Sequence, residues 1–477
     1  MHGSLGLTMV GTTGALFATN LSALYWELIT PNRVFVNNMD IYKLSKFSHI
    51  YEKDGKTMIY HSLNMLVDDI SGVIYRDADR TLENIDLRKK DSLLMNGFIV
   101  ENDETDHLLL EKCRAEIQEP YISTAYFFLT KNCTLACKYC FEKQSEVKNS
   151  LEGVMTYDTF IAGLDFFQRL IHVDSKRFEQ RKTIIFYGGE PFHNKKLLFS
   201  AIDEIQKRKS VGELPKQTKM LVVTNGTLIN DSDIDFLKHN DITVTFSLDG
   251  DEQASKNRVF VDGKTLAWKK ATDTFKKCVA AGIDLNIACT LSPETISRQR
   301  EVLDYFISIG AKNIGFNVIL DNDIIQLDDD YDDSAADFVA SSYAILSKHG
   351  ITENRTRRRI DVFKHKHPCL FDCNASGGRQ IAIAPNGDVG ICHEHIMDKK
   401  HFITSVYDIE FDPKSSPEYI LWSRRSPLFM EMCMGCIAQG VCGGGCVINS
   451  ERKHNSLFIP DPRFCKQTIS ILKNILL

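Results

Sequence analysis

Between residues 123 and 320, short apolar runs alternate with segments whose apolar positions recur at helical spacing. This alternation predicts strands that are each followed by a helix. The predicted strands are residues 123–130, 183–187, 220–223, 242–248, 285–290 and 313–320. The predicted helices are residues 157–173, 195–207, 231–239, 266–281 and 296–309. Repeated β–α units predict a parallel sheet with right-handed crossovers, so we expect an α/β fold built as an open, partial (β/α)6 barrel.

The chain before this region predicts a small α+β module over residues 33–117. A hairpin is expected at residues 49–62, followed by a helix at 87–95 and a strand at 98–100. Such a module could be purely structural, or it could offer a strand edge to a peptide.

The N-terminus resembles neither a signal peptide nor a spanning helix. Residues 1–26 contain no Asp, Glu, Lys or Arg, yet glycine, threonine and serine interrupt the apolar run. A signal peptide begins with a positive segment, and a spanning helix needs a more uniform apolar run. We predict a poorly ordered N-terminus and no membrane partner, with a membrane contact of this segment as the alternative.

Residues 321–333 are acidic and predict a solvated linker, and a helix is expected at residues 335–348. The predicted divisions are a poorly ordered N-terminus (1–32), the N-terminal module (33–117), the partial barrel (118–325), a linker helix region (326–364) and a cysteine-rich domain (365–477).

Composition and charge exclude one class of partner. The chain has 477 residues and a formal net charge of −6, which argues against a broad nucleic-acid-binding surface. Of its 14 cysteines, three lie within residues 133–140 and eight within residues 369–465. Short spacings of this kind are typical of metal ligands rather than of a disulfide framework, so we predict a reducing, cytoplasmic location.

Three of these cysteines, Cys133, Cys137 and Cys140, share one loop directly after the first strand of the predicted barrel. Three thiolates can hold three corners of a cubane iron–sulfur cluster and leave one iron open to a ligand. The alternative is a zinc site completed by a distant ligand, although the spacing CxxxCxxC is unusual for zinc.

Polar motifs follow the next three strands. They are Tyr187-Gly188-Gly189-Glu190-Pro191, Thr224-Asn225-Gly226-Thr227 and Ser247-Leu248-Asp249-Gly250. The carboxyl ends of parallel strands form one face, and that face carries the active site in α/β barrels. Glycines let backbone approach a ligand closely, and Glu190 can pair with an ammonium group. Asn225 and Ser247 supply neutral hydrogen-bonding groups, which suit a ribose or a carboxylate.

The C-terminal cysteines form a second candidate metal site. They are Cys369, Cys373, Cys392, Cys433, Cys436, Cys442, Cys446 and Cys465. Eight thiolates suit two four-ligand iron–sulfur clusters. The alternative is a pair of tetrahedral zinc sites, since Cys433-x2-Cys436 is by itself a good zinc half-site. The isolated Cys113, Cys278 and Cys289 are expected to be small buried side chains.

The CxxxCxxC loop, with an aromatic residue before its last cysteine, resembles the radical S-adenosylmethionine (SAM) superfamily. The resemblance implies that the loop binds a 4Fe–4S cluster whose open iron chelates the amino and carboxylate groups of SAM. Reductive cleavage of SAM would then yield a 5′-deoxyadenosyl radical that abstracts a hydrogen atom. By the same resemblance, Tyr139 lies against the adenine, Gly188-Gly189-Glu190 meets the amino group and Arg258 holds the carboxylate, while Asn225 and Ser247 suit the ribose or carboxylate. A surface role is the alternative for Arg258.

The C-terminal pattern, which includes Gly387 before Cys392, resembles the SPASM extension found in that superfamily, with Cys369 as an added eighth ligand. The resemblance implies two auxiliary 4Fe–4S clusters, and thus three clusters in all. The nearer auxiliary cluster would take Cys369, Cys373, Cys392 and Cys446. The outer one would take Cys433, Cys436, Cys442 and Cys465.

The N-terminal module resembles, more weakly, the winged-helix-like domains with which radical SAM peptide maturases bind a leader peptide as an added strand. We therefore predict a maturase that forms thioether or carbon–carbon crosslinks in a ribosomally made precursor peptide, with a flavodoxin or ferredoxin as reductant. The alternatives are an anaerobic sulfatase maturase, a maturase of an enzyme subunit, and a zinc-bound scaffold or binding protein. In sulfatase maturases a catalytic Asp follows the glycine-linked cysteine. Here that residue is His393, followed by Glu394, and no catalytic base is assigned.

Overall fold

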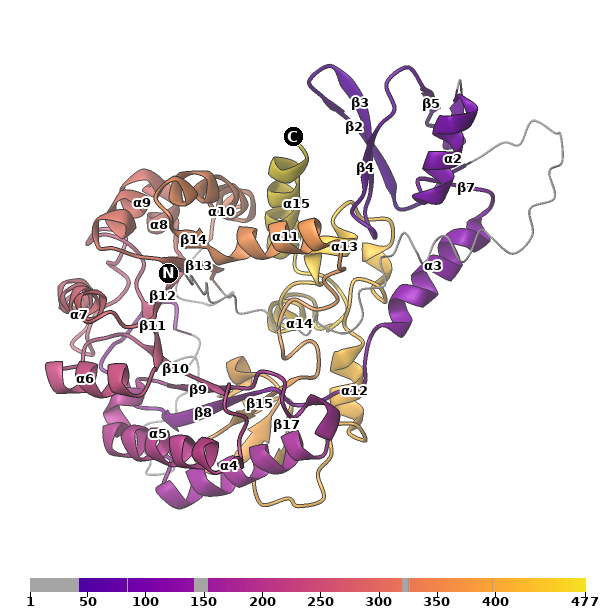
Figure 1. Cartoon of the computed structure of the whole chain (residues 1–477). Coiled ribbons are helices and arrows are strands. Elements are labelled where there is room, and N and C mark those ends of the chain that lie inside the picture. The colour runs from indigo at the N-terminus through magenta and orange to yellow at the C-terminus, as the bar shows by residue number, and fades with distance from the viewer. Residues whose placement is uncertain (1–42, 84, 141–152, 320–324, 326, 397) are drawn as a thin grey trace. The chain divides into compact units, whose positions relative to one another are not determined.

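The computed structural model describes residues 43–83, 85–140, 153–319, 325, 327–396 and 398–477. Contacts divide this part of the chain into two compact units (Figure 1). The sheet unit comprises residues 119–357 and 374–423, and the cysteine-rich unit comprises residues 43–118, 358–373 and 424–477. The predictions for residues 1–32 and 321–324 fall outside the described residues.

The sheet unit is built on one sheet, in the order β14-β13-β12-β11-β10-β9-β8-β15-β16-β17. Strands β8 to β14 are parallel, which confirms the predicted α/β fold and partial barrel. Its parallel strands are β8 (Thr124–Thr130), β9 (Thr183–Gly188), β10 (Lys219–Thr224), β11 (Thr243–Ser247), β12 (Leu285–Leu291), β13 (Asn313–Val318) and β14 (Thr352–Glu353). All six predicted strands are present.

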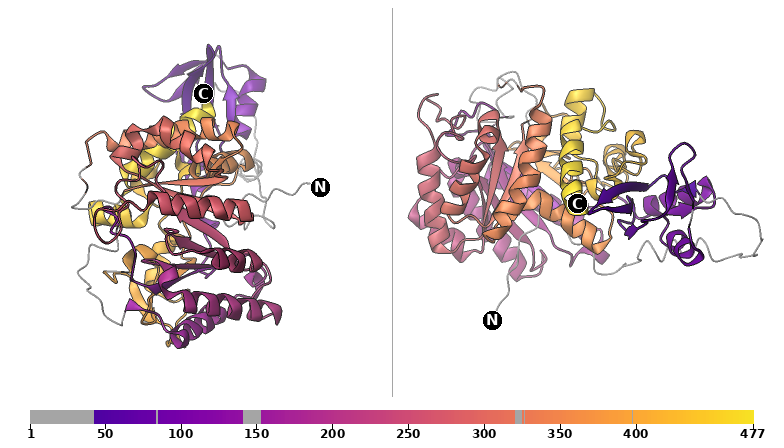
Figure 2. Two further views of the ribbon diagram at one scale, coloured as in Figure 1. Left: turned by 90° about the vertical axis from the view of Figure 1, so that its left-hand side faces the viewer. Right: turned by 90° about the horizontal axis from the view of Figure 1, so that it is seen from above.

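Helices connect the strands of this unit, and the longer ones lie on the outer side of the curved sheet (Figures 1 and 2). They are α4 (Tyr157–His172), η3 (Ser175–Arg177), η4 (Pro191–Asn194), α5 (Lys195–Ser210), α6 (Asp231–His239), α7 (Trp268–Ala281), α8 (Pro293–Ser297), α9 (Gln299–Ser308), α10 (Tyr331–Lys348) and α12 (Pro417–Ser423). The predicted helix 296–309 is wrong in one respect: Arg298 leaves helical geometry, with φ −119° and ψ 33°, and separates α8 from α9. Helix α11 (Asn354–His365) continues from this unit into the other.

Helix α4 packs against the parallel sheet and excludes water from the face that it covers. Its buried positions Phe160, Leu164, Phe167 and Ile171 follow the helical repeat and face the sheet. Gly163 lies so close to the sheet that a Cβ atom there would be 2.9 Å from the Phe127 ring and 3.2 Å from Ile383 Cδ1. Helix and sheet therefore share a close-packed core.

Three further strands extend the sheet beyond β8. They are β15 (Gln380–Ile383), β16 (Asp388–Gly390) and β17 (Phe402–Ser405), and η5 (His393–His395) lies between the last two. β15 runs parallel to β8, with Gln380 opposite Thr124 and Ile383 opposite Phe127. The Asn374 side-chain amide also donates to Thr124 Oγ1 at 2.8 Å. The segment that carries Cys392 is thus part of the same sheet as the strand that precedes Cys133.

The cysteine-rich unit joins the N-terminal module to the C-terminal segment. Its sheets have the orders β5-β6-β1-β7 and β2-β3-β4. The strands are β1 (Lys43–Leu44), β2 (Ser48–Lys53), β3 (Lys56–His61), β4 (Val67–Asp69), β5 (Ile74–Arg76), β6 (Thr81–Glu83) and β7 (Ile99–Val100). The helices are α2 (Leu87–Met95), α3 (Asp103–Ala115), η6 (Glu431–Cys433), α13 (Gln439–Cys442), α14 (Val447–His454) and α15 (Pro462–Leu476). The predicted hairpin and the helix at 87–95 are confirmed.

None of the helices in the described ranges is long and apolar enough to cross a membrane.

Candidate active site

The loop with Cys133, Cys137 and Cys140 follows β8 and is pinned to a second segment of the sheet unit. Backbone hydrogen bonds join the two segments: Ala136 N to Val259 O at 2.7 Å, Lys138 N to Asn257 O at 3.1 Å, and Val261 N to Thr134 O at 3.0 Å. All three thiols are unoxidised and partly exposed. These hydrogen bonds therefore hold the backbone that carries the three sulfur atoms in place.

Two side-chain donors approach these sulfur atoms. Asn225 Nδ2 lies 3.7 Å from Cys133 Sγ, and Arg258 Nη1 lies 4.0 Å from Cys137 Sγ. Hydrogen bonds to sulfur are a usual means of stabilising thiolates that hold an iron–sulfur cluster. The donor set therefore fits a thiolate-held cluster in this loop.

A buried network fixes Tyr139 of the loop. The Asp249 carboxylate accepts hydrogen bonds from the Tyr139 hydroxyl and from Arg258 Nε, the latter at 3.0 Å, and from Thr290 N at 3.0 Å. The Arg258 guanidinium also stands over the Tyr139 ring, 5.5 Å from its centroid. Arg258 is buried, so the alternative of a surface arginine is wrong. Its predicted contact with the SAM carboxylate stays a prediction.

The ion pair between Asp249 and Arg258 is buried, with side-chain exposures of 1% for Asp249 and 10% for Arg258. The negative charge of Asp249 is therefore needed to balance that of Arg258. We expect Asp249→Asn to lower the free energy of unfolding by about 3 kcal/mol, because it leaves the Arg258 charge buried without a counter-ion. Chemical unfolding followed by circular dichroism measures this effect. Asp273→Asn, which breaks an exposed ion pair on α7, is the control and should change the unfolding midpoint little. Equal midpoints for both variants would contradict the expectation.

Gly188 and Gly189 are required by the protein's own packing. A Cβ atom on Gly188 would lie 2.3 Å from Thr130 O, and one on Gly189 would lie 2.4 Å from Asn132 O. Gly188 also has a φ of +138°, which favours glycine. The backbone that approaches these glycines in the structure is the start of the cysteine loop. Their contact with SAM stays a prediction.

Glu190 connects two of the motifs. Its buried carboxylate accepts hydrogen bonds from Phe192 N at 3.1 Å, Thr224 Oγ1 at 2.8 Å and Asn225 N at 2.8 Å. Burial raises the pKa of Glu190 to about 7, and these hydrogen bonds act in the opposite direction. Glu190 therefore holds the backbone of Asn225, whose side chain reaches Cys133.

The four predicted motifs lie at the carboxyl ends of β8, β9, β10 and β11, which are consecutive in the sheet. Asn225 Nδ2 donates to Thr134 Oγ1 at 3.1 Å, and Asn225 Oδ1 accepts from Thr227 N at 2.9 Å. Ser247 is the last residue of β11 and is half-buried. The prediction that these motifs share one face of the sheet is confirmed.

Aromatic side chains of β8 and β9 pack against His393, and the sequence pattern did not assign this cluster a role. The His393 ring stacks on Tyr126, with centroids 4.3 Å apart and 6° between the planes, and lies 5.3 Å from the Tyr187 ring. His393 and Glu394 are only 21% and 22% exposed, so neither is an ordinary surface side chain. His393 Nδ1 and Glu394 Oε2 are buried without a hydrogen-bond partner among the residues described here. Because Tyr187 directly precedes Gly188, His393 lies beside the glycine motif.

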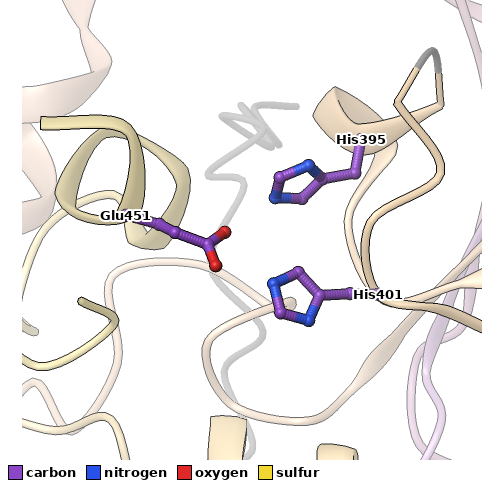
Figure 3. A group of neighbouring side chains, drawn as sticks. All are labelled: His395, His401 and Glu451. Atoms are coloured by element: carbon purple, nitrogen blue, oxygen red, sulfur yellow. The ribbon is translucent and has the colours of Figure 1, made fainter. Parts of the chain in front are cut away.

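A histidine pair follows closely in the sequence, and it too was missed. The rings of His395 and His401 are 5.1 Å apart and edge-to-face, and their nearest nitrogens lie within 4.8 Å of one another (Figure 3). Each Nδ1 is hydrogen-bonded to a carboxylate: His395 to Asp398 at 2.9 Å, and His401 to Glu418. These carboxylates fix the tautomer and orientation of both rings. Figure 3 also draws Glu451, which belongs to the cysteine-rich unit.

The cysteine-rich unit brings together the four cysteines predicted for the outer cluster. Burial raises the pKa of the Cys465 thiol to about 12, and the neighbouring thiols of Cys442, Cys433 and Cys436 act in the same direction. Burial and the thiols of Cys442 and Cys436 likewise raise the pKa of Cys433 to about 12. Thiols that influence one another in this way would be deprotonated on binding a metal. The set therefore fits a four-thiolate metal site, and it would suit iron–sulfur or zinc.

Three cysteines of the predicted nearer cluster, Cys369, Cys373 and Cys446, also belong to the cysteine-rich unit. The fourth, Cys392, is buried in the sheet unit, so the grouping of all four stays a prediction. The isolated Cys113, Cys278 and Cys289 are at most 1% exposed, as expected for small buried side chains.

Comparison with known proteins agrees with this geometry. The model of the radical SAM superfamily matches residues 127–306. The radical SAM cyclopropyl synthase TigE of Paramaledivibacter caminithermalis is 23% identical over 462 residues, which span 88% of this chain and 93% of that protein. The cysteine-type anaerobic sulfatase-maturating enzyme of Clostridium perfringens is 23% identical over 346 residues, which span 69% of this chain and 89% of that enzyme.

Two solved structures share the fold. The anSMEcpe structure with bound AdoMet has a TM-score of 0.62 and 19% identity, and covers 75% of this chain and 93% of its own. Streptococcus suis SuiB bound to S-adenosylmethionine has a TM-score of 0.53 and 13% identity, and covers 89% of this chain and 99% of its own. SuiB is also known bound to the precursor peptide SuiA. At these identities the likeness shows the fold alone.

Proposed function

We propose that this chain, whose residues 127–306 match the radical SAM superfamily, is a radical SAM maturase that modifies a ribosomally made peptide. The N-terminal module would bind the precursor, and the sheet unit would carry out the radical step. The catalytic loop, the glycine motif and the buried Arg258–Asp249 pair supply the chain's own part of that site.

One observation carries the peptide assignment: the N-terminal module shares its core with the cysteine-rich C-terminal segment. Phe47, Leu63 and Leu109 form one buried cluster with Leu428. A second cluster joins residues of β3 and the following turn to α13 and α15; its members include Tyr60, Met65, Val441 and Leu472. A peptide held on this module would therefore be held at a fixed position relative to the cysteines of the same unit.

The module and the C-terminal segment come into close backbone contact at Gly440. Gly440 N donates to Ser62 O at 2.9 Å, and a Cβ atom on Gly440 would lie 2.3 Å from the same oxygen. The Gly440 carbonyl in turn accepts a hydrogen bond from Cys369 N at 2.7 Å. The module is thus connected through one glycine to the first residue of the C-terminal cysteine set.

The module also has strand edges at which an extended peptide could add. β5 lies at one end of the sheet β5-β6-β1-β7, and β4 lies at one end of β2-β3-β4. Ile74 on β5 is 55% exposed, and Val67 on β4 is 38% exposed. An edge strand with exposed apolar side chains suits recognition by strand addition, in which backbone hydrogen bonds supply affinity and side chains supply specificity.

The site residues define where the cofactors would be held. Cys133, Cys137 and Cys140 would hold the radical SAM cluster, and the eight C-terminal cysteines would hold two auxiliary clusters in a SPASM-like arrangement. Tyr139, Gly188, Gly189, Glu190, Asn225, Ser247 and Arg258 would surround SAM. When bound, these groups would supply a 5′-deoxyadenosyl radical for hydrogen abstraction and accept an electron, and a flavodoxin or ferredoxin would be the external reductant.

For the bond formed, we favour a carbon–carbon bond over a thioether. TigE, which matches 88% of this chain, is a cyclopropyl synthase, and closing a cyclopropane ring forms a carbon–carbon bond. Formylglycine formation is the second candidate, because a sulfatase-maturating enzyme matches 69% of this chain. The residue after Cys392 is His393 and not the Asp expected by resemblance for that reaction.

The experiment is anaerobic co-expression with the product of a short reading frame adjacent to the gene, followed by mass spectrometry of the peptide. We expect a loss of two hydrogen atoms from a peptide in which every cysteine thiol can still be alkylated, and no reaction with a hydrazide probe. A loss of two hydrogen atoms together with one thiol that is no longer alkylated would indicate a thioether instead. A hydrazide-reactive aldehyde would favour the formylglycine alternative. An unmodified peptide, together with active SAM cleavage and modification of a protein substrate, would overturn the peptide assignment.

Recognition by the module can be tested separately. We expect Ile74→Asp to weaken peptide binding about tenfold, which is about 1.4 kcal/mol, while uncoupled SAM cleavage is unchanged. Fluorescence polarisation with a labelled precursor measures the affinity. Leu87→Asp is the matched control, because Leu87 is 78% exposed but lies on α2 and not on an edge strand. Equal affinities for both variants would rule out recognition at β5.

A further inference from the structure

The sulfur of Cys369 lies against two arginine side chains of the same unit. Arg358 Nη2 donates to Cys369 Sγ at 3.0 Å, and Arg359 Nη1 lies 3.8 Å from the same atom. Their side chains are 13% and 4% exposed. Both also bond to one carboxylate, since Asp372 Oδ1 is 2.8 Å from Arg359 Nη2 and 3.3 Å from Arg358 Nη1. One buried carboxylate therefore faces two buried guanidinium groups.

A third guanidinium, that of Arg425, is fully buried. Its bonds are to uncharged oxygens: Leu457 O at 2.6 Å, Gly444 O at 2.7 Å, Gly445 O at 3.1 Å and Ser450 Oγ at 2.7 Å. In the residues that the structure covers, no carboxylate makes an ion pair with Arg425. Its Nη2 also lies 3.5 Å from Cys446 O. Burial lowers the pKa of Arg425, and Cys446, Cys373, Asp372 and Cys442 act in the opposite direction.

These charges do not balance without a further anion. Arg358, Arg359 and Arg425 carry three positive charges, and Asp372 supplies one negative charge. A buried, uncompensated charge is strongly unfavourable. The oxidised core of a 4Fe–4S cluster carries about +2, so three thiolates make its net charge about −1 and a fourth makes it about −2. A bound cluster would therefore supply negative charge of the kind that these guanidinium groups lack.

We propose that Arg358, Arg359 and Arg425, here called the arginine triad, neutralise the auxiliary cluster held by Cys369, Cys373 and Cys446 and raise its reduction potential above that of the outer cluster. This inference rests on the proposed presence of auxiliary clusters. Reduction adds a negative charge, and nearby cations and N–H···S hydrogen bonds stabilise the more negative state.

The outer set lacks such donors. Its one sulfur contact of this kind is from a backbone amide, Ala438 N to Cys436 Sγ at 3.4 Å. The charge of Arg425 also acts on Cys433, but within the described ranges no guanidinium hydrogen-bonds to Cys433, Cys442 or Cys465. The two clusters would therefore differ in reduction potential, and an electron released by the substrate would be accepted preferentially by the cluster beside the triad.

The test is a redox titration followed by electron paramagnetic resonance, in full-length protein that carries Cys133, Cys137 and Cys140→Ala so that only auxiliary clusters respond. Into this parent we would introduce Arg358→Met, Arg425→Met and Arg358→Lys. Arg114→Met is the control, because Arg114 lies in the same unit but bonds to Leu428 O and Glu111. Iron content is measured in every sample.

We expect Arg358→Met and Arg425→Met to lower one of two midpoint potentials. At the parent midpoint the ratio of reduced to oxidised cluster should fall at least tenfold, which is about 59 mV for a one-electron couple. Arg358→Lys should shift it less, and Arg114→Met should not shift it. Iron falling from about 8 to about 4 atoms in Arg358→Met, but not in Arg358→Lys, would also support neutralisation by the triad.

Unchanged midpoint potentials in both methionine variants, with iron still at about 8 atoms per chain, would show that the triad does not tune the cluster. The proposed function would then be unaffected. A parent that binds zinc and no iron would overturn the auxiliary clusters themselves, and the triad's redox role with them. The two failures are therefore distinguishable by metal content alone.

Discussion

Replacing Cys133, Cys137 and Cys140 together with alanine is expected to abolish cleavage of SAM. It should also lower the iron content of anaerobically reconstituted protein from about 12 to about 8 atoms per chain. The three thiols lie on one loop held by backbone hydrogen bonds to residues 257–261, so the substitution removes ligands without removing the loop's own contacts. 5′-Deoxyadenosine formed under reducing, anaerobic conditions measures the activity.

The matched control is Cys278→Ala. Cys278 is a fully buried cysteine of the same unit, on α7 and remote in sequence from the loop. It should retain both SAM cleavage and iron. Persistent 5′-deoxyadenosine in the triple variant would contradict the assignment of the loop. Iron that falls from about 4 atoms to near zero, with zinc present, would instead identify the C-terminal cysteines as zinc ligands.

Gly189→Ala is expected to have the second-largest effect, although glycine and alanine differ by one methyl group. The added Cβ would lie 2.4 Å from Asn132 O and 2.6 Å from Lys131 O. Both contacts are to backbone, which cannot rotate away as a side chain can. The residues that must move directly precede Cys133, so we expect a loss of about 1–3 kcal/mol of stability together with most of the bound radical SAM cluster.

The measurements are the iron content and the visible absorbance of the reconstituted variant, and the unfolding midpoint of the apoprotein. Gly315→Ala is the control: Gly315 is on β13, and its nearest neighbours would be 3.9 Å from a new Cβ. Full cluster occupancy in Gly189→Ala, equal to that in Gly315→Ala, would show that the loop adapts. The packing argument for this glycine would then be wrong.

The shared core of the cysteine-rich unit changes how the N-terminal module must be tested. Deleting residues 1–117 would remove Phe47, Tyr60, Leu63 and Met65 from clusters that also contain C-terminal residues. Such a deletion would expose apolar surface and destabilise the unit, so reduced turnover would not report on peptide recognition. Point substitutions on an exposed strand edge leave these clusters intact.

The sequence by itself determined the elements whose signal is local. The β–α alternation from residue 123 onward and the helices at 87–95 and 231–239 depend on periodicity and caps within a few residues; α6, for example, begins with a capping box between Asn230 and Asp233. The cysteine loop and the strand-end motifs are also contiguous in sequence. A parallel sheet aligns the ends of its strands, so the sequence could place these motifs on one face.

Only the tertiary structure decided the contacts between distant segments. Nothing in residues 380–383 indicates that they pair with β8, because the sequence of an apolar strand does not specify which strand it pairs with. The same holds for the aromatic residues around His393, for the Glu190 hydrogen bonds and for the core shared by the N-terminal module and the C-terminal segment. The arginine triad is clearest: Arg425 is 56 positions after Cys369 in the numbering of the chain, and only folding places its charge among thiols. Side-chain burial and charge balance are properties of three-dimensional neighbours, and the order of residues does not encode them locally.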